Sequence, residues 1–409
     1  MAKPNNVVIV GAGIAGLSTA FHLADKGAKG VTLIDKGRVG SGSSSRSGAV
    51  NTMMMATERA TRARGVSFDI FERFDRILDD YEFHQVGCMA IYDAEQMATA
   101  AQLFDMQRQA GARFEVLDGA EIESRFPDLR VREGDGGVLD LRGGWNEPDR
   151  YIPALTAKIR EMGVAIREDS PVEEFLVDDG RVAGVRLRGG EELRTDATVC
   201  TVNAWANSLL SRVGQPLPAR NFVHERFVTK PFDHPPRLPA VNCNAASTYF
   251  RPTESNGLLI GASNMECVQV VPDVDFDLSE LTPTPNSLEL ILGAVGDYIP
   301  LMQNATIDYH RVGLVSYPID FMPNIGPVAA LPGLFLGTNF CSGGFGHHPM
   351  AGKLIAEYIV DGQTSFDGAD FDPDRFADFD TEEFLNRDVS HSEMVDAHAA
   401  TGKVVIRKH

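Results

Sequence analysis

Three glycines near the N-terminus have the spacing of a turn that holds a nucleotide. Gly11, Gly13 and Gly16 follow a short apolar run, and Asp35 ends the next one. In such a unit the first glycine allows a tight turn, the second lets the backbone approach a pyrophosphate, and the third lets the helix pack closely on the strand. The acid accepts hydrogen bonds from a ribose, and the helix N-terminus attracts phosphates. We therefore predict a nucleotide site formed by Gly11, Gly13, Ile14, Ala15, Gly16, Asp35 and Lys36.

A serine-rich segment at 40–48 comes directly after this unit and contains one cation. Serine hydroxyls and a guanidinium suit phosphate oxygens, whereas the alternative is a solvated loop. We predict a second pyrophosphate contact, made by Ser43, Ser44, Ser45, Arg46 and Ser47.

Another glycine-rich turn, at 341–349, precedes a predicted helix at 350–360. The turn directs a second helix N-terminus at a ligand. His347 and His348 follow its glycines and are candidate catalytic groups. The alternative for each histidine is a packed, hydrogen-bonded place in the core.

The composition excludes several classes of protein. A chain of 409 residues favours two domains, and 43% hydrophobic with 23% charged residues indicates a folded core. The formal charge of -19 disfavours nucleic acid and anionic membranes as partners. The five cysteines occur singly, without a CxxC pair or a Cys/His cluster, so we expect a reduced protein with no metal site. We see no targeting signal or membrane span and expect a cytoplasmic location.

The arrangement of apolar runs predicts an α/β fold with a second, mainly antiparallel β-sheet domain. Short strands are expected near Ala165 and Val172 and at 182–187 and 198–202. Residues 221–310 are richer in β-branched and aromatic residues, which favours antiparallel strands. The predicted units are a discontinuous nucleotide-binding domain at 1–80, 146–220 and 311–365, a substrate-binding domain at 81–145 and 221–310, and a loosely docked acidic extension at 366–409.

These motifs, in this order, resemble the D-amino acid oxidase superfamily of flavoproteins, which holds glycine oxidase, sarcosine oxidase and D-amino acid dehydrogenases. The resemblance covers about residues 6–362 and rests on segments 7–16 with Asp35, 40–46, 201–205, 319–326 and 343–349. It implies a Rossmann-type domain that binds FAD, with further contacts from Val172, Asn203, Trp205, Gly343, Gly344, Phe345, Gly346 and His347.

The chain departs from the family at three points. Gly313 and Arg46 stand where covalent flavoproteins carry a Cys or a His, so the resemblance implies noncovalent FAD. Gly346 stands where sarcosine oxidase-like members have a lysine, and Thr52 where an arginine is frequent. These two contacts are therefore not transferred to this chain.

The resemblance implies hydride transfer from an amine C–H to flavin N5, giving an imine that water hydrolyses. The substrates it implies are glycine, sarcosine, a D-amino acid or an iminodiacetate-like N-carboxymethyl compound, with oxygen or another electron acceptor. Tyr249 and Arg251 alternate on one strand and are candidates to hold the substrate carboxylate, the alternative being an exposed edge pair. His224, Arg226 and Trp145 are expected to be structural.

Two other functions stay open. A 2-hydroxy acid dehydrogenase of the same fold would use His347 or His348 as its base. A flavin-binding subunit of a larger oxidoreductase would bind FAD without acting on a small substrate. The sequence leaves the electron acceptor and the oligomeric state open.

Overall fold

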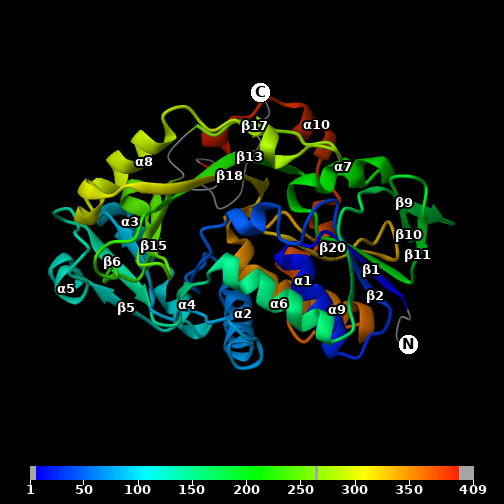
Figure 1. The fold of residues 1–409 in the computed structure, drawn as a ribbon, viewed down its shortest axis with the longest axis horizontal. Coiled ribbons are helices and arrows are strands. Elements are labelled where there is room, and N and C mark those ends of the chain that lie inside the picture. Colours follow the sequence, from blue (N-terminus) through cyan, green and yellow to red (C-terminus); the bar gives the residue numbers. More distant parts are fainter. Residues whose placement is uncertain (1–5, 263–265, 396–409) are drawn as a thin grey trace.

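The computed structural model describes residues 6–262 and 266–395. A six-stranded sheet occupies the right half of Figure 1, in the order β19-β20-β12-β1-β2-β8, with all pairs parallel except β19 with β20. Its strands are β1 (Val7–Val10), β2 (Val31–Ile34), β8 (Ala165–Arg167), β12 (Ala197–Cys200), β19 (Asn324–Pro327) and β20 (Leu334–Thr338). β1 and β12 are covered on both faces and buried along their whole length; β1 is apolar throughout, and β12 is apolar except for Thr198.

The two faces of this sheet have different covers. Val7 and Ile9 of β1 point to one face and belong to the apolar cluster that includes helices α1 (Ile14–Asp25), α2 (Glu58–Ile77), α6 (Pro148–Glu161) and α9 (Gly344–Val360). Val8 and Val10 point to the other face, toward a three-stranded sheet and helix α7 (Ala206–Leu210). The three strands are β9 (Val172–Asp178), β10 (Arg181–Leu187) and β11 (Glu192–Arg194).

A nine-stranded sheet forms the framework of the other half, and its pairs are antiparallel except β14 with β4. Its strands are β4 (Cys88–Tyr92), β5 (Phe114–Leu117), β6 (Gly136–Asp140), β13 (Ala219–Thr229), β14 (Ala240–Cys243), β15 (Thr248–Pro252), β16 (Leu258–Ala262), β17 (Gln269–Val270) and β18 (Ile307–Pro318). The helices of this half are α3 (Ala94–Ala101), α4 (Phe104–Gln109), α5 (Gly119–Arg125) and α8 (Ser287–Gly296). A short ladder joins β3 (Val50–Asn51) to β7 (Gly144–Trp145).

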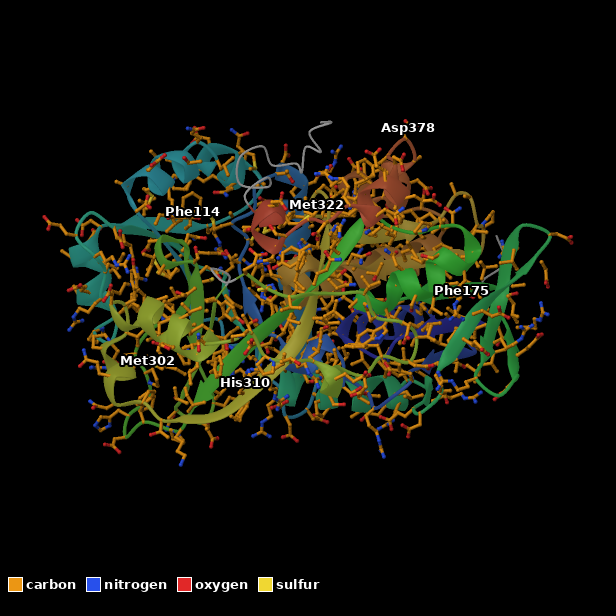
Figure 2. All side chains as sticks on the ribbon, turned by 90° about the horizontal axis from the view of Figure 1, so that it is seen from above. Phe114, Phe175, Met302, His310, Met322 and Asp378 are labelled. Atoms are coloured by element: carbon orange, nitrogen blue, oxygen red, sulfur yellow. The ribbon has the colours of Figure 1, made fainter. Side chains whose placement is uncertain are left out.

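The α/β class and the antiparallel second sheet are confirmed. Strand β18 pairs with β13 from Ile307 to Pro318, so residues 311–318, predicted as part of the nucleotide-binding domain, lie in the larger sheet. Figure 2 shows Met302 and Phe175 toward opposite ends of the long axis, one in each half. Among the described helices, none is long and apolar enough to cross a membrane.

The predicted loose docking of the C-terminal extension is wrong for its described part, 366–395. Phe371 is buried in the cluster of α1 and α9, whereas Phe384 and Met394 are buried against β13 and β18. Arg375 binds Asp320 through two nitrogens, at 2.8 and 3.0 Å. Burial of its phenylalanines holds this segment against the rest of the protein in spite of its net negative charge. Residues 396–409 lie outside the described part.

Candidate functional site

A single long cavity of about 850 Å³ runs from the glycine turn after β1 to strands β4, β14 and β15 of the larger sheet. Its first end is lined by Gly11, Asp35 and Val172, and its far end by Ala90 and Tyr249. The cavity therefore joins the predicted nucleotide site to the predicted substrate domain.

Two of the three N-terminal glycines are required by close contacts. Gly11 has a φ of +105°, and a Cβ there would lie 2.9 Å from the carbonyl oxygen of Thr201. A Cβ on Gly16 would lie 1.9 Å from the carbonyl oxygen of Gly11. Gly16 does not line the cavity, so its role is the predicted one of letting α1 pack closely on the turn.

The Asp35 carboxylate fixes the start of the nucleotide site. Its Oδ2 accepts a hydrogen bond from Ala12 N at 2.7 Å, and its Oδ1 accepts one from Gly37 N at 2.9 Å. Burial raises the pKa of Asp35, and the two backbone donors oppose that shift. Each oxygen keeps a second lone pair for a ribose hydroxyl.

The serine-rich segment covers the N-terminus of α1. Ser44 Oγ accepts a hydrogen bond from Ile14 N at 3.0 Å, and Ser43, Ser44, Arg46 and Ser47 line the cavity. Ser45 does not line it. Its carbonyl instead accepts hydrogen bonds from two guanidinium groups, those of Arg226 and Arg311, at 2.8 Å each, so the structure gives Ser45 a supporting place.

Most of the other predicted cofactor contacts line the cavity, and two do not. Val172, Asn203, Trp205 and Lys36 line the cavity, and Lys36 Nζ lies 4.3 Å above the Trp205 ring. Gly13, Ile14, Ala15, Gly343, Gly344 and Phe345 also line it, whereas Gly346 and His347 do not. A glycine turn that admits no side chain, an acid with spare lone pairs and two helix N-termini on one cavity fit FAD.

Both predicted catalytic histidines lie outside the cavity. His348 is fully buried among Phe71, Tyr151 and Phe345, and its Nε2 is 2.7 Å from the Tyr151 hydroxyl. His347 is 3% exposed and packs against Phe371. Burial lowers the pKa of His348 to about 3 and that of His347 well below its usual value. The catalytic assignment of these two histidines is therefore not supported. The structure supports the alternative, a packed place in the core, for both of them.

The buried imidazole of His348 makes stability depend on pH. Below about pH 6.5 the unfolded chain binds a proton that the folded chain refuses until about pH 3, so the free energy of unfolding falls as the pH falls through that window. We expect His348→Gln to reduce this slope by up to about 1.4 kcal/mol per pH unit. Urea unfolding at several pH values from 7 to 4 measures the slope, and an unchanged slope would contradict a neutral His348.

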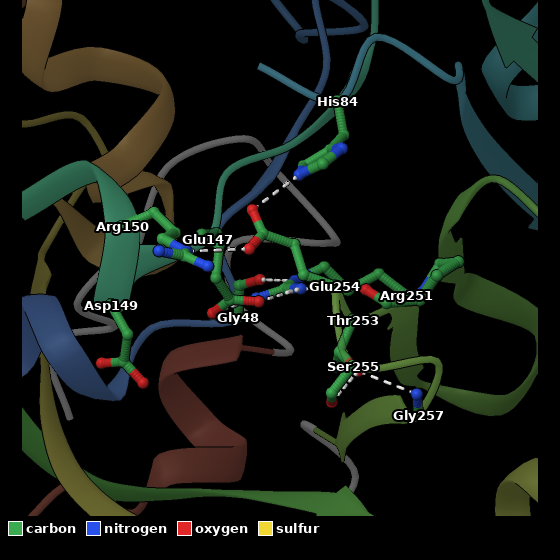
Figure 3. A network of polar contacts seen from close by, with 12 residues as sticks. Gly48, His84, Glu147, Asp149, Arg150, Arg251, Thr253, Glu254, Ser255 and Gly257 are labelled. Atoms are coloured by element: carbon green, nitrogen blue, oxygen red, sulfur yellow. Dashed lines mark hydrogen bonds and ion pairs between the residues drawn. The ribbon is translucent and has the colours of Figure 1, made fainter. Parts of the chain in front are cut away.

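Arg251 was predicted to hold the substrate, but the structure places it in a buried polar network (Figure 3). The side chain is 0% exposed and does not line the cavity. Its Nε donates to the Gly48 carbonyl at 2.7 Å, its Nη1 lies 3.2 Å from Glu147 Oε2, and the guanidinium lies over Trp145. Arg251 thus fixes the segment at Gly48 to the start of α6, and the substrate assignment is not supported.

Replacing Arg251 by methionine should destabilise the fold and leave KM of the folded enzyme unchanged. The substitution leaves the carboxylate of Glu147 without its buried partner, a loss of about 3–5 kcal/mol. Arg150→Met is the control, because Arg150 is exposed and belongs to the same network through Glu254. Urea unfolding measures the difference, and a rise in KM at unchanged stability would restore the original assignment.

Tyr249 does line the cavity, and two glycines make room for its ring. A Cβ on Gly48 would lie 2.5 Å from the ring, and one on Gly261 would lie 2.3 Å from it. His224, expected to be structural, also lines the cavity, with its Nε2 2.8 Å from the Tyr317 hydroxyl. Arg226 is buried and keeps its expected structural place.

The residue that sequence reasoning missed is Arg64 of α2. Its side chain is buried, yet it lines the cavity. Cβ atoms on Gly343 and Gly346 would lie 2.7 Å and 1.0 Å from its guanidinium nitrogens, so the group lies across the first turn of α9. Arg64 lies on the buried face of α2, between Ala60, Ala63 and Ser67. An arginine among small residues on an otherwise buried helix face is unusual, and this pattern could have pointed to Arg64 from the sequence.

Comparison with known proteins agrees with this geometry. Residues 6–358 match the family described as FAD dependent oxidoreductase. The chain is 26% identical over 378 residues to 4-methylaminobutanoate oxidase (formaldehyde-forming) of Paenarthrobacter nicotinovorans, covering 90% of this chain and 45% of that protein. It is 26% identical over 388 residues to glycine oxidase of Pseudomonas putida, covering 90% and 98%. It therefore spans about half the length of the first relative and nearly all of the second.

Among solved structures, L-proline dehydrogenase from P. horikoshii superposes with a TM-score of 0.84 at 25% sequence identity. The match covers 92% of this chain and 99% of that one. The glycine turn, the acid and the covering serine segment occupy one cavity in a fold shared over almost the whole length. The chain belongs to the FAD dependent oxidoreductase family, and FAD is its cofactor.

Proposed function

We propose that the chain oxidises the C–N bond of a small amine that carries a carboxylate, with FAD as the electron acceptor. The observation that carries this proposal is Arg64, a buried guanidinium on the cavity wall. Among the described residues, no acid forms an ion pair with it and no group accepts its hydrogen bonds. Asp140 acts on it only through space, because that carboxylate accepts from Thr52 and Met53.

The other cations of the cavity wall are already bound within the protein. Lys36 and Arg46 each donate to two backbone carbonyls, and Arg188 forms an ion pair with Asp275. Burial lowers the pKa of Arg64 to about 10, which leaves the group charged at neutral pH. Among the described cations of the cavity wall, Arg64 is thus the one whose guanidinium has neither an ion-pair partner nor a hydrogen-bond acceptor within the protein.

The position of Arg64 calls for an anion. The first turn of α9 carries the positive end of a helix dipole, which disfavours a guanidinium lying on it. An anion bound between the Arg64 guanidinium and the N-terminus of α9 would be attracted by both and would offset the repulsion between them. A substrate carboxylate supplies such an anion, and a guanidinium binds it through two hydrogen bonds.

The rest of the far end suits the amine. Met54, Met55 and Ala90 supply apolar surface that excludes water, and the Tyr249 ring is fixed above Gly48. When bound, FAD accepts two electrons from the substrate. The residues around it hold the carboxylate at Arg64 and direct the carbon that bears nitrogen toward the cofactor. Oxidation gives an imine, and its hydrolysis by water releases the amine and a carbonyl compound.

The names of the relatives support this substrate class. Glycine, 4-methylaminobutanoate and L-proline, on which the three compared proteins are named to act, each combine an amine with a carboxylate. A 2-hydroxy acid is less well supported, because the base proposed for it, His347 or His348, lies outside the cavity.

Anaerobic visible spectra test the proposal. We expect one or more of glycine, sarcosine, L-proline and 4-methylaminobutanoate to bleach the flavin, and the matched amines methylamine and pyrrolidine to leave it oxidised. Admission of oxygen then separates an oxidase from a dehydrogenase. Equal bleaching by pyrrolidine and L-proline would contradict the carboxylate site, and bleaching by 2-hydroxy acids alone would contradict amine chemistry. A flavin that no compound bleaches would favour a subunit of a larger complex.

A further inference from the structure

Three side chains with metal-binding atoms meet behind the cavity wall. His224 lies on β13, Cys267 lies between β16 and β17, and His391 lies in the C-terminal segment. Their ligand atoms all lie within 4.8 Å of one another. Cys267 and His391 are buried and His224 is half-buried, so solvent competes little for these atoms.

The surroundings hold the three side chains in place. The Tyr317 hydroxyl is 2.8 Å from His224 Nε2 and 3.5 Å from His391 Nε2. The Glu266 carboxylate, next to Cys267, accepts hydrogen bonds from the backbone N of His391 at 2.7 Å and of Ser392 at 3.3 Å. A tyrosine and a glutamate therefore connect all three segments around the cluster, as the polar groups around a metal site do.

We propose that His224, Cys267 and His391 bind one zinc ion. One thiolate and two imidazoles form a borderline-soft donor set of the kind that zinc prefers. Zinc bond lengths place ligand atoms roughly 3.3 to 3.6 Å apart in a tetrahedron, so atoms that now lie within 4.8 Å of one another must approach by at most about 1.5 Å. Binding breaks the S–H bond of Cys267, releases its proton to water and changes no oxidation state. A water molecule completes the tetrahedron.

The ion would join parts of the chain that are distant in sequence. Its ligands come from the long strand β13 of the larger sheet, from the connection between β16 and β17, and from the C-terminal segment that packs on that sheet. Because His224 and Tyr317 also line the cavity, the ion would fix this part of its wall. The role is structural and does not depend on the proposed substrate.

Metal analysis of the full-length holoenzyme tests the site. The protein is produced with added zinc, freed of any polyhistidine tag, dialysed without chelator and measured by mass spectrometry of the elements. We expect one zinc per chain, and Cys267→Ser and His391→Gln to lower the zinc content by more than about tenfold. Cys200→Ser is the control, because Cys200 is buried in β12 away from the cluster and from the cavity.

Flavin absorbance shows whether each variant still folds. A second measurement, which needs no variant, replaces zinc by Co²⁺ and records its d–d bands at wavelengths where oxidised flavin does not absorb. Intense tetrahedral bands support the site. A zinc-free wild type that also gives no such bands would overturn the proposal, as would full zinc content in Cys267→Ser.

Discussion

Replacing Arg64 by alanine is expected to lower kcat/KM for an amino carboxylate by about 30-fold to 1000-fold, mostly through KM. The substitution removes a buried charged partner of the substrate carboxylate, worth about 2–4 kcal/mol. The charge of the carboxylate does not change when the C–N bond is oxidised, so Arg64 binds it about equally in the ground state and the transition state, and kcat should change less than KM. Steady-state kinetics with the substrate found by flavin bleaching measures both constants.

Several controls separate this role from a structural one. Arg62→Ala, on the exposed face of the same helix, should leave the kinetics unchanged. Arg64→Lys keeps the charge without the fork and should fall between wild type and Arg64→Ala. Added guanidinium ion should partly rescue Arg64→Ala. Because Arg64 lacks an internal ion pair, its loss should not lower the melting temperature. An unchanged KM with a lowered flavin potential would assign Arg64 to the cofactor instead.

Gly16→Ala is expected to yield a protein with little or no bound FAD. The new Cβ would overlap the Gly11 carbonyl, and this contact is with backbone, so the turn after β1 must move. Overpacking of this kind costs about 1–3 kcal/mol, which lowers FAD affinity by roughly 5-fold to 150-fold if the displaced turn is the one that binds it. Fluorescence titration of the apoprotein with FAD measures the affinity.

The matched control is Gly293→Ala. Gly293 is also helical, in α8, but nothing lies within 4 Å of a Cβ built there. Alanine should therefore stabilise the protein slightly, by up to about 1 kcal/mol, and leave FAD affinity unchanged. Wild-type affinity in Gly16→Ala would show that the turn adapts and that the packing argument is wrong.

The nucleotide end could be predicted because its information is local. Gly11, Gly16 and Asp35 act through backbone geometry and one short βαβ unit, which a stretch of sequence specifies by itself. The same holds for the strand pattern from Ala165 to Cys200. Such features need no knowledge of what packs against them.

The substrate end could not be predicted, because its geometry depends on distant segments. Arg251 and Tyr249 do alternate on β15, but Glu147 and the Gly48 carbonyl bind the arginine, and neither neighbours it in sequence. In the same way, His348 contacts Tyr151 and His347 contacts Phe371, and neither partner is near them in sequence.

The proposed zinc ligands could not be predicted from the sequence for the same reason. Metal sites are recognised in sequence by short spacings between their ligands. His224, Cys267 and His391 come from separate segments, and only the packing of the C-terminal extension on the larger sheet brings them together.

The order of the central sheet has a consequence for synthesis on the ribosome. β1 pairs with β2 and β12, and β12 with β20, which begins only at Leu334. At about 5–20 residues per second, the nascent chain waits roughly 15 to 65 s between emergence of β1 and emergence of β20. From the emergence of β12 to that of β20, roughly 7 to 27 s, the buried edge of β12 has no partner, and the turn that opens α9 has not yet been made. FAD should therefore load after translation, and slower growth or chaperone supply should raise the yield of yellow protein.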